Sequence, residues 1–202
     1  MDDKYSIVNI RSYLDSESPS FLGEAKLQSL LSEFSSPQNA DVEHFLHSNA
    51  INFTQKSQSV TYLVFNSETA DFVGYFALAV KPLTIKADGI SKTASKKLSR
   101  VSILDEEDGT YTASAYLIAQ LGKNYALKKD LRIAGSDLLA LAQQIIETLR
   151  FAAGGVLEFL ECEDNPFLLD FYTKNGFKPF DTRRTATNNG TQHLLHQLLK
   201  FI

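Results

Sequence analysis

The sequence is poor in the residues that cross-link small or secreted proteins. Of its 202 residues only Cys162 is a cysteine, and tryptophan is absent. A single cysteine excludes an intrachain disulfide and a thiolate zinc cage, so a reducing cytoplasm is the natural compartment. No cluster of histidines, acids or cysteines completes a metal site in the sequence, so we expect no metal.

The chain also lacks a long hydrophobic run and a strong charge of either sign. No uninterrupted apolar stretch approaches the roughly 18 residues of a membrane span, and the N-terminus has no signal-peptide pattern. The formal net charge is −4, from 20 Lys and Arg against 24 Asp and Glu. This balance argues against a dedicated DNA-binding protein. We therefore expect a cytoplasmic protein without a membrane or DNA partner.

What remains is an ordinary globular composition, with 44% hydrophobic residues. The length predicts a single domain over residues 1–202. A serine-rich N-terminal extension of helix and loop covers residues 1–40. Residues 86–109 carry a basic block followed by an acidic one, and opposite charge blocks in one loop are usually solvated. We interpret this segment as an exposed insertion.

Hydrophobic periodicity predicts the order of the helices and strands. A helix follows an N-cap at Asp41, and two β-branched strands at 60–65 and 72–80 form an antiparallel hairpin. The later elements are a strand over 114–121, a helix over 137–150, a strand over 156–162, a helix that Asn165-Pro166 opens, and a strand over 194–202. This order predicts an α/β fold with one parallel strand–helix–strand crossover.

The segment after the strand at 114–121 carries the clearest chemical signal. A basic loop follows the strand, and Gly135-Ser136 then opens an amphipathic helix. Free N–H groups and the dipole at a helix N-terminus bind phosphate, and glycine lets the backbone approach a ligand closely. The cations available to neutralise phosphates are Lys123, Lys128, Lys129 and Arg132. A plain turn with a serine N-cap explains the same residues without a ligand.

Residues 116–177 resemble the acetyl-CoA-binding half of the GCN5-related N-acetyltransferase (GNAT) superfamily. The family has a strand, a phosphate loop Gln/Arg-x-x-Gly-x-Gly/Ala, a helix, a second strand, and a helix that ends in aromatic-Tyr and Asn-Gly-Phe. The matching segments are Tyr116–Leu121, Arg132–Gly135, Asp137–Arg150, Val156–Cys162 and Phe171-Tyr172-Thr173-Lys174-Asn175-Gly176-Phe177. The resemblance implies a mixed, largely antiparallel central sheet flanked by helices.

The phosphate loop departs from the family pattern in both possible alignments. Placing Arg132 first puts Asp137 at the Gly/Ala position. Sliding by two residues makes Gly135 the second glycine, replaces the first by Ile133 and puts Asp130 at the Gln/Arg position. We prefer the second alignment because Leu138-Leu139 then match the paired aliphatics of family helices. One glycine is missing either way, and Asp137 would repel a pyrophosphate unless it points away.

The resemblance implies direct transfer of an acetyl group from acetyl-CoA, the co-substrate, to a primary amine. Tyr172 would protonate the departing thiolate, and Glu161 or Glu163, which share one face of a strand, would take the amine proton; a water chain is the alternative. Backbone groups at the strand end would hold the oxyanion. The cofactor-binding candidates are Gln120, Leu121, Gly122, Lys123, Arg132, Ile133, Ala134, Gly135, Ser136, Asn165 and Tyr172.

The acceptor stays open at this point: a small molecule, a protein or an aminoacyl-tRNA. The closest likeness within the superfamily is to toxins that acetylate aminoacyl-tRNA and pair with a small antitoxin, although the acidic net charge and the insertion argue against that role. A non-catalytic acyl-CoA-binding module, which the eroded loop favours, and a bare α/β interaction domain are the other readings. A homodimer through the C-terminal strand is also left open.

Overall fold

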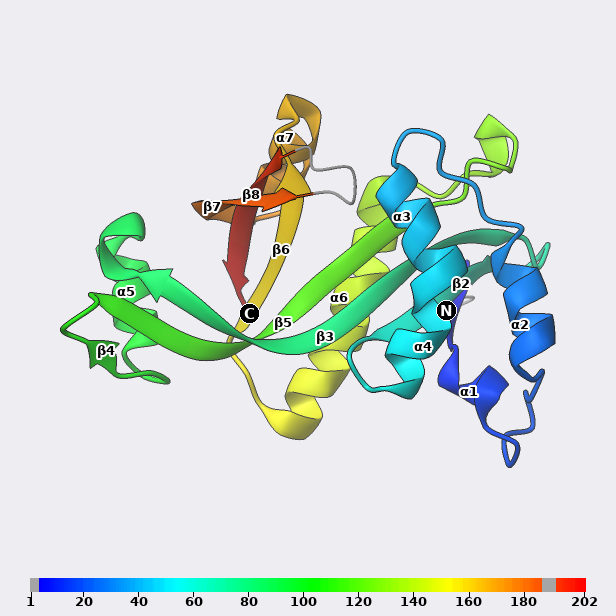
Figure 1. Ribbon diagram of the computed structural model, residues 1–202, viewed down its shortest axis with the longest axis horizontal. Coiled ribbons are helices and arrows are strands. Elements are labelled where there is room, and N and C mark those ends of the chain that lie inside the picture. Colours follow the sequence, from blue (N-terminus) through cyan, green and yellow to red (C-terminus); the bar gives the residue numbers. More distant parts are fainter. Residues whose placement is uncertain (1–3, 187–191) are drawn as a thin grey trace. The chain divides into compact units, whose positions relative to one another are not determined.

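The computed structural model describes residues 4–186 and 192–202 (Figure 1). In the first half of the chain, the elements are β1 Tyr5–Asn9, α1 Arg11–Leu14, α2 Glu24–Leu31, α3 Ala40–His44, the π-helix η1 Phe45–Asn49, α4 Ala50–Gln55, β2 Val60–Asn66, β3 Phe72–Lys86, the 3-10 helix η2 Ala87–Gly89 and α5 Lys92–Leu98. In the second half they are β4 Leu104–Asp105, β5 Thr110–Lys123, the 3-10 helix η3 Lys129–Leu131, α6 Gly135–Ala153, β6 Leu157–Glu163, α7 Pro166–Lys174, β7 Lys178–Ala186 and β8 Gln192–Phe201.

The strands of the described residues pair into one mixed sheet. Their order is β1-β2-β3-β5-β6-β8-β7, and β4 pairs with β5 beside this path. β5 and β6 are the parallel pair, and the other pairs are antiparallel. A parallel pair requires a crossover, and α6 supplies it. The predicted α/β fold with one strand–helix–strand crossover is therefore confirmed.

The chain divides into two compact units, which we describe separately. Unit 1 contains the residues up to Ala79 together with Ile118–Thr148, and unit 2 contains Val80–Leu117 and Leu149–Ile202. The long strands β3 and β5 and the helix α6 each pass from one unit into the other. The expectation of a single domain over 1–202 stays a prediction.

Unit 1 buries an aromatic cluster beneath its N-terminal helices. Tyr75 of β3 is fully buried and donates its hydroxyl to the carbonyl of Val42 at 2.6 Å. The ring of Phe34 meets Tyr75 edge-on with 5.1 Å between centroids, and the ring of Phe45 is parallel to Tyr75 with 6.4 Å between centroids. Such aromatic pairs add roughly 0.5–1.5 kcal/mol to the burial of their surface. The contacts of Tyr75 thus hold the N-terminal helical segment of unit 1 against β3.

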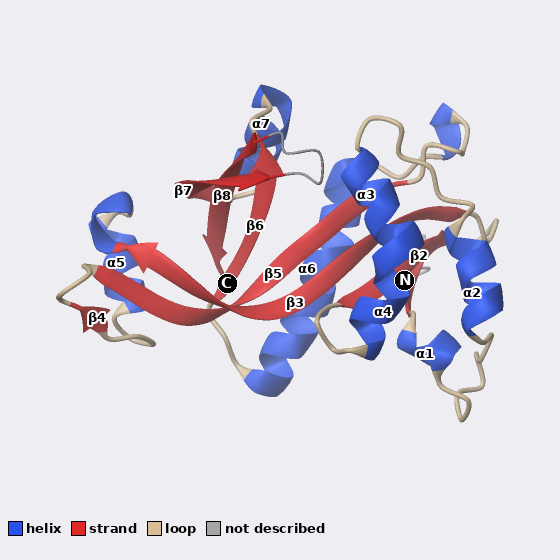
Figure 2. Ribbon diagram, in the orientation of Figure 1, coloured by secondary structure: helices blue, strands red, loops and turns tan. Residues whose placement is uncertain are grey.

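The helix expected after Asp41 is a continuous run of α3, η1 and α4, which Figure 2 shows as one rod. Its N-cap is Asn39, whose side chain accepts a hydrogen bond from the N–H of Val42 at 3.1 Å. The predicted cap at Asp41 is therefore wrong by two residues. Asp41 lies in the first turn, where its charge favours the helix dipole. Sequence reasoning also missed β1, which is only five residues long.

Unit 2 is built on the antiparallel strands β6, β8 and β7. β6 pairs with β8 so that Glu161 lies opposite Gln197, and β7 joins on the far side with Asp181 opposite Gln197. The insertion contributes to the core of this unit, because Leu98 of α5 is fully buried in a cluster with Leu83 and Phe159. The C-terminal strand expected at 194–202 is confirmed as β8.

Candidate active site

Close packing of glycines defines the end of β5 in unit 1. Gly122 is buried, and a Cβ atom there would lie 2.6 Å from Val42 and 2.8 Å from Tyr75. A Cβ on Gly74 of β3 would lie 2.7 Å from the carbonyl oxygen of Gly122. Both positions therefore require glycine for steric reasons alone. The sequence predicts Gly122 as a cofactor contact, and the structure adds a packing role beneath the N-terminal helices.

Asn124 anchors the loop that leaves β5. Its side chain is buried, and its Oδ1 accepts hydrogen bonds from the N–H groups of Ser35 and Ala126, both at 3.0 Å. Its Nδ2 donates to the carbonyl of Phe72 at 2.9 Å. A buried amide that loses partners leaves unsatisfied groups, each costing about 1–3 kcal/mol. No pattern marked Asn124 in the sequence, because its partners come from distant segments.

Arg132 forms its hydrogen bonds within the same loop. Its Nε donates to the carbonyl of Leu127 at 2.8 Å and its NH2 nitrogen to that of Tyr125 at 3.0 Å. The guanidinium also lies 4.9 Å from the centroid of the Tyr125 ring. These contacts hold the loop in shape, so Arg132 orders the segment between β5 and α6 from within. Lys128 and Lys129 are exposed.

The N-terminus of α6 follows directly. The N–H of Leu138 bonds the carbonyl of Ala134 at 3.1 Å, so Ala134 precedes the first helical residue. The N–H groups of Gly135, Ser136 and Asp137 have no intrahelical acceptor at this position. Within the described part of the chain, no other hydrogen bond takes them. They form a set of three donors reinforced by the helix dipole.

The side chains around these donors differ in burial. Ile133, Leu138 and Leu139 are buried. Ala134 and Ser136 are exposed, and so is the carboxylate of Asp137, which accepts a hydrogen bond from Ser136 Oγ at 3.4 Å. The structure thus brings 133–137 together at one helix end. Gln120, Leu121 and Lys123 lie half-buried on β5.

In unit 2, Asn165 caps α7. Its Oδ1 accepts a hydrogen bond from the N–H of Phe167 at 2.9 Å, and Pro166 occupies the first helical position. The helix opening predicted at Asn165-Pro166 is confirmed. Its capping role gives Asn165 a structural reason to be there, independent of a contact with CoA.

Tyr172 lies on the same helix, partly buried between aromatic rings. Its ring meets Phe171 at 5.0 Å and Phe177 at 6.0 Å between centroids. Burial raises the pKa of the Tyr172 hydroxyl well above its ordinary value, and the neighbouring Cys162 adds to the rise. The hydroxyl therefore holds its proton at neutral pH, as a general acid must. Among the described residues it has no hydrogen-bond partner.

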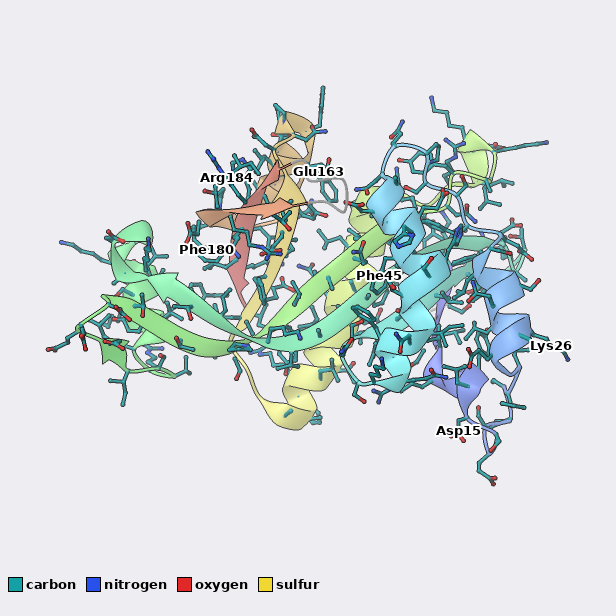
Figure 3. The ribbon with its side chains drawn as sticks, in the orientation of Figure 1. Asp15, Lys26, Phe45, Glu163, Phe180 and Arg184 are labelled. Carbon is teal, nitrogen blue, oxygen red and sulfur yellow. The ribbon has the colours of Figure 1, made fainter. Side chains whose placement is uncertain are left out.

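The two candidate bases on β6 have different surroundings. The carboxylate of Glu161 is occupied at both oxygens, by Arg183 NH2 at 2.6 Å and by Gln197 Nε2 at 2.7 Å. Glu163 is exposed at the end of the strand, where Figure 3 labels it. A carboxylate bound by a cation and an amide is held in one orientation. Glu163 is therefore the freer of the two.

Two further groups surround the end of β6. His196 of β8 lies with its Nε2 3.0 Å from Asp164 Oδ1. Burial raises the pKa of the Cys162 thiol to about 11, helped by the negative charges of Glu163 and Asp164. The thiol is thus protonated and unreactive at neutral pH. Sequence reasoning missed the His196–Asp164 contact, because only the β6–β8 register brings these residues together.

Two general features of the described residues bear on function. No helix in 4–186 or 192–202 combines the length and apolarity needed to cross a membrane. Over the same ranges, no group of three His, Cys, Asp or Glu side chains is arranged to hold a metal ion.

The chain is similar to known proteins in its structure but not in its sequence. No protein-family model and no curated protein matches the chain. Among solved structures, AtaT complexed with acetyl-methionyl-tRNAfMet is 14% identical, covers 94% of this chain and 93% of its own, and has a TM-score of 0.61. A tyrosine-to-phenylalanine mutant of KacT is 15% identical over 96% of this chain and 95% of its own, with a TM-score of 0.60.

A third structure, a tyrosine-to-phenylalanine mutant of the AtaT toxin bound to the C-terminus of the antitoxin AtaR and acetyl-CoA, is 15% identical. It covers 98% of this chain and 94% of its own, with a TM-score of 0.57. The chain therefore has the fold of these proteins over nearly its whole length. At these identities the likeness shows a shared fold, which is the fold that the resemblance in the sequence implies.

Proposed function

We propose that this chain is an acetyl-CoA-dependent N-acetyltransferase that passes an acetyl group directly to a primary amine. The observation that carries the proposal is the open N-terminus of α6 in a fold shared with AtaT and KacT. Three backbone donors and a helix dipole at one end of a helix favour a diphosphate. The shared fold supports CoA as the molecule that carries it, since a structure of this fold holds acetyl-CoA.

The residues around α6 suggest how the cofactor would be held. The N–H groups of Gly135, Ser136 and Asp137 would receive the pyrophosphate oxygens, with exposed Lys128 and Lys129 as countercharges. The exposed Asp137 carboxylate would repel the pyrophosphate, because both are negatively charged. We therefore expect an affinity limited by this one side chain rather than by the backbone.

The transfer itself would use backbone and side chains in turn. The amine nitrogen attacks the thioester carbonyl, backbone N–H groups on β5 stabilise the oxyanion, and the C–S bond breaks. Tyr172 gives its proton to the departing thiolate, for which its protonated state at neutral pH is suited. Glu163, or a water chain, takes the amine proton. Glu161 is better suited to orienting Arg183 and Gln197.

A second candidate function is that of a toxin that acetylates aminoacyl-tRNA. It is favoured by the structure of AtaT with acetyl-methionyl-tRNAfMet, and the antitoxin fragment on the AtaT mutant suggests an antitoxin partner. Arg184 on β7 is exposed and would suit a phosphate. The net charge of −4 is the observation that weighs against it. In either case the cytoplasm is the compartment we propose.

Calorimetric titration with acetyl-CoA and with free CoA tests the cofactor site. We expect micromolar binding of both, and Asp137→Asn should tighten it by up to roughly fivefold by removing one repulsive charge. Asp105→Asn, which removes an exposed charge from the insertion, is the matched control and should change nothing. A folded wild type that binds neither ligand would overturn the proposal and leave an interaction domain.

An acetylation assay then separates the remaining functions. Radiolabelled acetyl-CoA is offered with polyamines, with peptides bearing free amino groups, with methionyl-tRNA, and with the same tRNA without its amino acid. Labelling of charged tRNA alone would select the toxin. Labelling of small amines or peptides would select a general N-acetyltransferase. Binding of acetyl-CoA with no transfer to any acceptor would favour a non-catalytic acyl-CoA-binding module.

A further inference from the structure

A cavity of about 370 Å³ lies within unit 2, between the insertion and the strands β7 and β8. One wall comes from η2 and α5, and the other from the first residues of β7 and the last of β8. The two walls approach closely at Gly89, where a Cβ atom would lie 3.1 Å from the carbonyl oxygen of Phe180. Phe180 is labelled on β7 in Figure 3.

The lining of this cavity is cationic, although the chain as a whole is acidic. Three lysines line it, Lys97, Lys178 and Lys200, and none of the lining residues is an acid. The ammonium of Lys97 lies 4.9 Å from the centroid of the Phe201 ring, and that of Lys200 lies 5.5 Å from Phe177. Lys200 also pairs with buried Glu158 at 3.2 Å. Two of the three positive charges, those of Lys97 and Lys178, thus have no carboxylate partner in the described residues.

The other walls are mostly apolar, and they include Ser91 and Thr93. Ile90, Phe180 and Leu199 line the cavity and also pack against the core cluster of unit 2. Cavities of this size, lined by apolar side chains with a few polar groups, are typical of small-molecule sites. The combination of apolar walls and unpaired cations selects a ligand with a hydrophobic body and one negative charge.

We propose that this cavity binds a small aromatic carboxylate or sulfonate. The aromatic body packs on Ile90, Phe180 and Leu199, and the anionic group meets Lys97 and Lys178. The inference rests on unit 2 alone and does not depend on the proposed acetyl transfer. It gives the insertion a function, since η2 and α5 supply one wall of the site.

Fluorescence titration with 8-anilinonaphthalene-1-sulfonate tests the site on the full chain. We expect one saturable site, and 2-naphthoate should displace the dye while the neutral 2-naphthamide should not. The double variant Lys97→Gln with Lys178→Gln should weaken dye binding by roughly tenfold, since each charge-assisted contact is lost. Lys96→Gln lies on the same helix, outside the cavity, and is the matched control.

A second pair of variants tests the shape of the site. Ala94→Phe places a ring in the cavity and should abolish binding, whereas Ala152→Phe, at an exposed position of α6, should not. Thermal melts verify that each variant is folded. Absence of saturable binding, equal displacement by the acid and the amide, or equal dye affinity in the lysine variant and its control would each overturn the proposal.

Discussion

The two candidate regions of this molecule present different kinds of chemistry. At the N-terminus of α6 in unit 1, the groups available to a ligand belong to the backbone, and the nearby arginine is consumed in holding its own loop. At the end of β6 and on α7 in unit 2, the available groups are side chains: a protonated tyrosine, a carboxylate and a histidine–aspartate pair. Backbone donors tolerate changes of sequence that side chains do not.

This difference explains why one region departs from the pattern of the superfamily that the sequence resembles, while the other keeps it. The loop can lose a glycine of the consensus and still present three N–H groups, because any residue supplies them. The closing motif from Phe171 to Phe177 cannot vary in the same way, since the ring of Tyr172 contacts the rings of Phe171 and Phe177 in the same motif. We expect mutation of Tyr172 in unit 2 to affect chemistry, and mutation of Gly122 in unit 1 to affect packing.

The sharpest test of the comparison is Tyr172→Phe. If Tyr172 is the general acid, turnover falls by roughly 10²- to 10⁴-fold while the affinity for acetyl-CoA stays within twofold. The measurement is the rate of acetyl transfer, with calorimetric titration of acetyl-CoA in parallel. Tyr5→Phe on β1 serves as the control. A variant that keeps full turnover would remove Tyr172 from the mechanism.

The matching test in unit 1 is Gly122→Ala. A Cβ within 3 Å of Val42, Tyr75 and Phe34 forces the helical rod away from β5, so we expect a loss of about 2–3 kcal/mol in the free energy of unfolding. Gly109→Ala is the control, because it has a positive φ of 65° but open space around it; its cost should be about 1 kcal/mol. Urea denaturation measures both, and equal losses would contradict the packing argument.

Burial of unit 2 can be probed through Cys162 and pH. Its pKa of about 11, against an ordinary 9.0, predicts that at pH 8 the folded chain reacts with a thiol reagent about a hundredfold more slowly than the unfolded chain. The raised pKa also stabilises the fold fully below pH 9, and this contribution is lost as the pH rises from 9 to 11, because the unfolded chain releases its proton first.

Labelling rates in buffer and in urea test the first statement, and urea denaturation at pH 7 and pH 10.5 tests the second. The unfolded chain is its own control, since it carries the same single thiol. Glu163→Gln should speed labelling of the folded chain by removing one of the charges that raise the pKa. Rapid labelling of the folded chain would mean that Cys162 is not buried as described.

The smallest expected effect concerns the cap of α7. Asn165→Ala removes the acceptor of the Phe167 N–H and should cost about 1 kcal/mol in stability. Thr173→Ala, at an exposed position of the same helix, should stay within about 0.5 kcal/mol. If Asn165 also contacts CoA, the variant loses affinity for acetyl-CoA beyond its loss of stability. Thermal melts with and without acetyl-CoA separate the two contributions.

Local pattern was sufficient for much of this fold. The helix α6, the strand β6 and the opening of α7 lie within three residues of their predicted bounds, because amphipathic period, the Asn-Pro pair and β-branched runs are properties of neighbouring residues. The N-cap at Asn39 and the strands β1, β4 and β7 were not found. Asn39 and Asp41 are both acceptable N-caps, and the sequence alone does not choose between them. A strand of five residues is too short to show a clear alternation of apolar and polar side chains.

The sequence by itself determined the order of the longer central elements, the crossover and the helix end that offers backbone donors, since each depends on short-range chemistry. Only the tertiary structure decided which charged groups are already occupied. In the sequence Arg132 is a candidate for cofactor binding and Glu161 a candidate base. In the structure the partners of Arg132 lie in its own loop, and those of Glu161 lie on β7 and β8. Strand register and packing between distant segments determine which groups become partners, and no local sequence pattern predicts them.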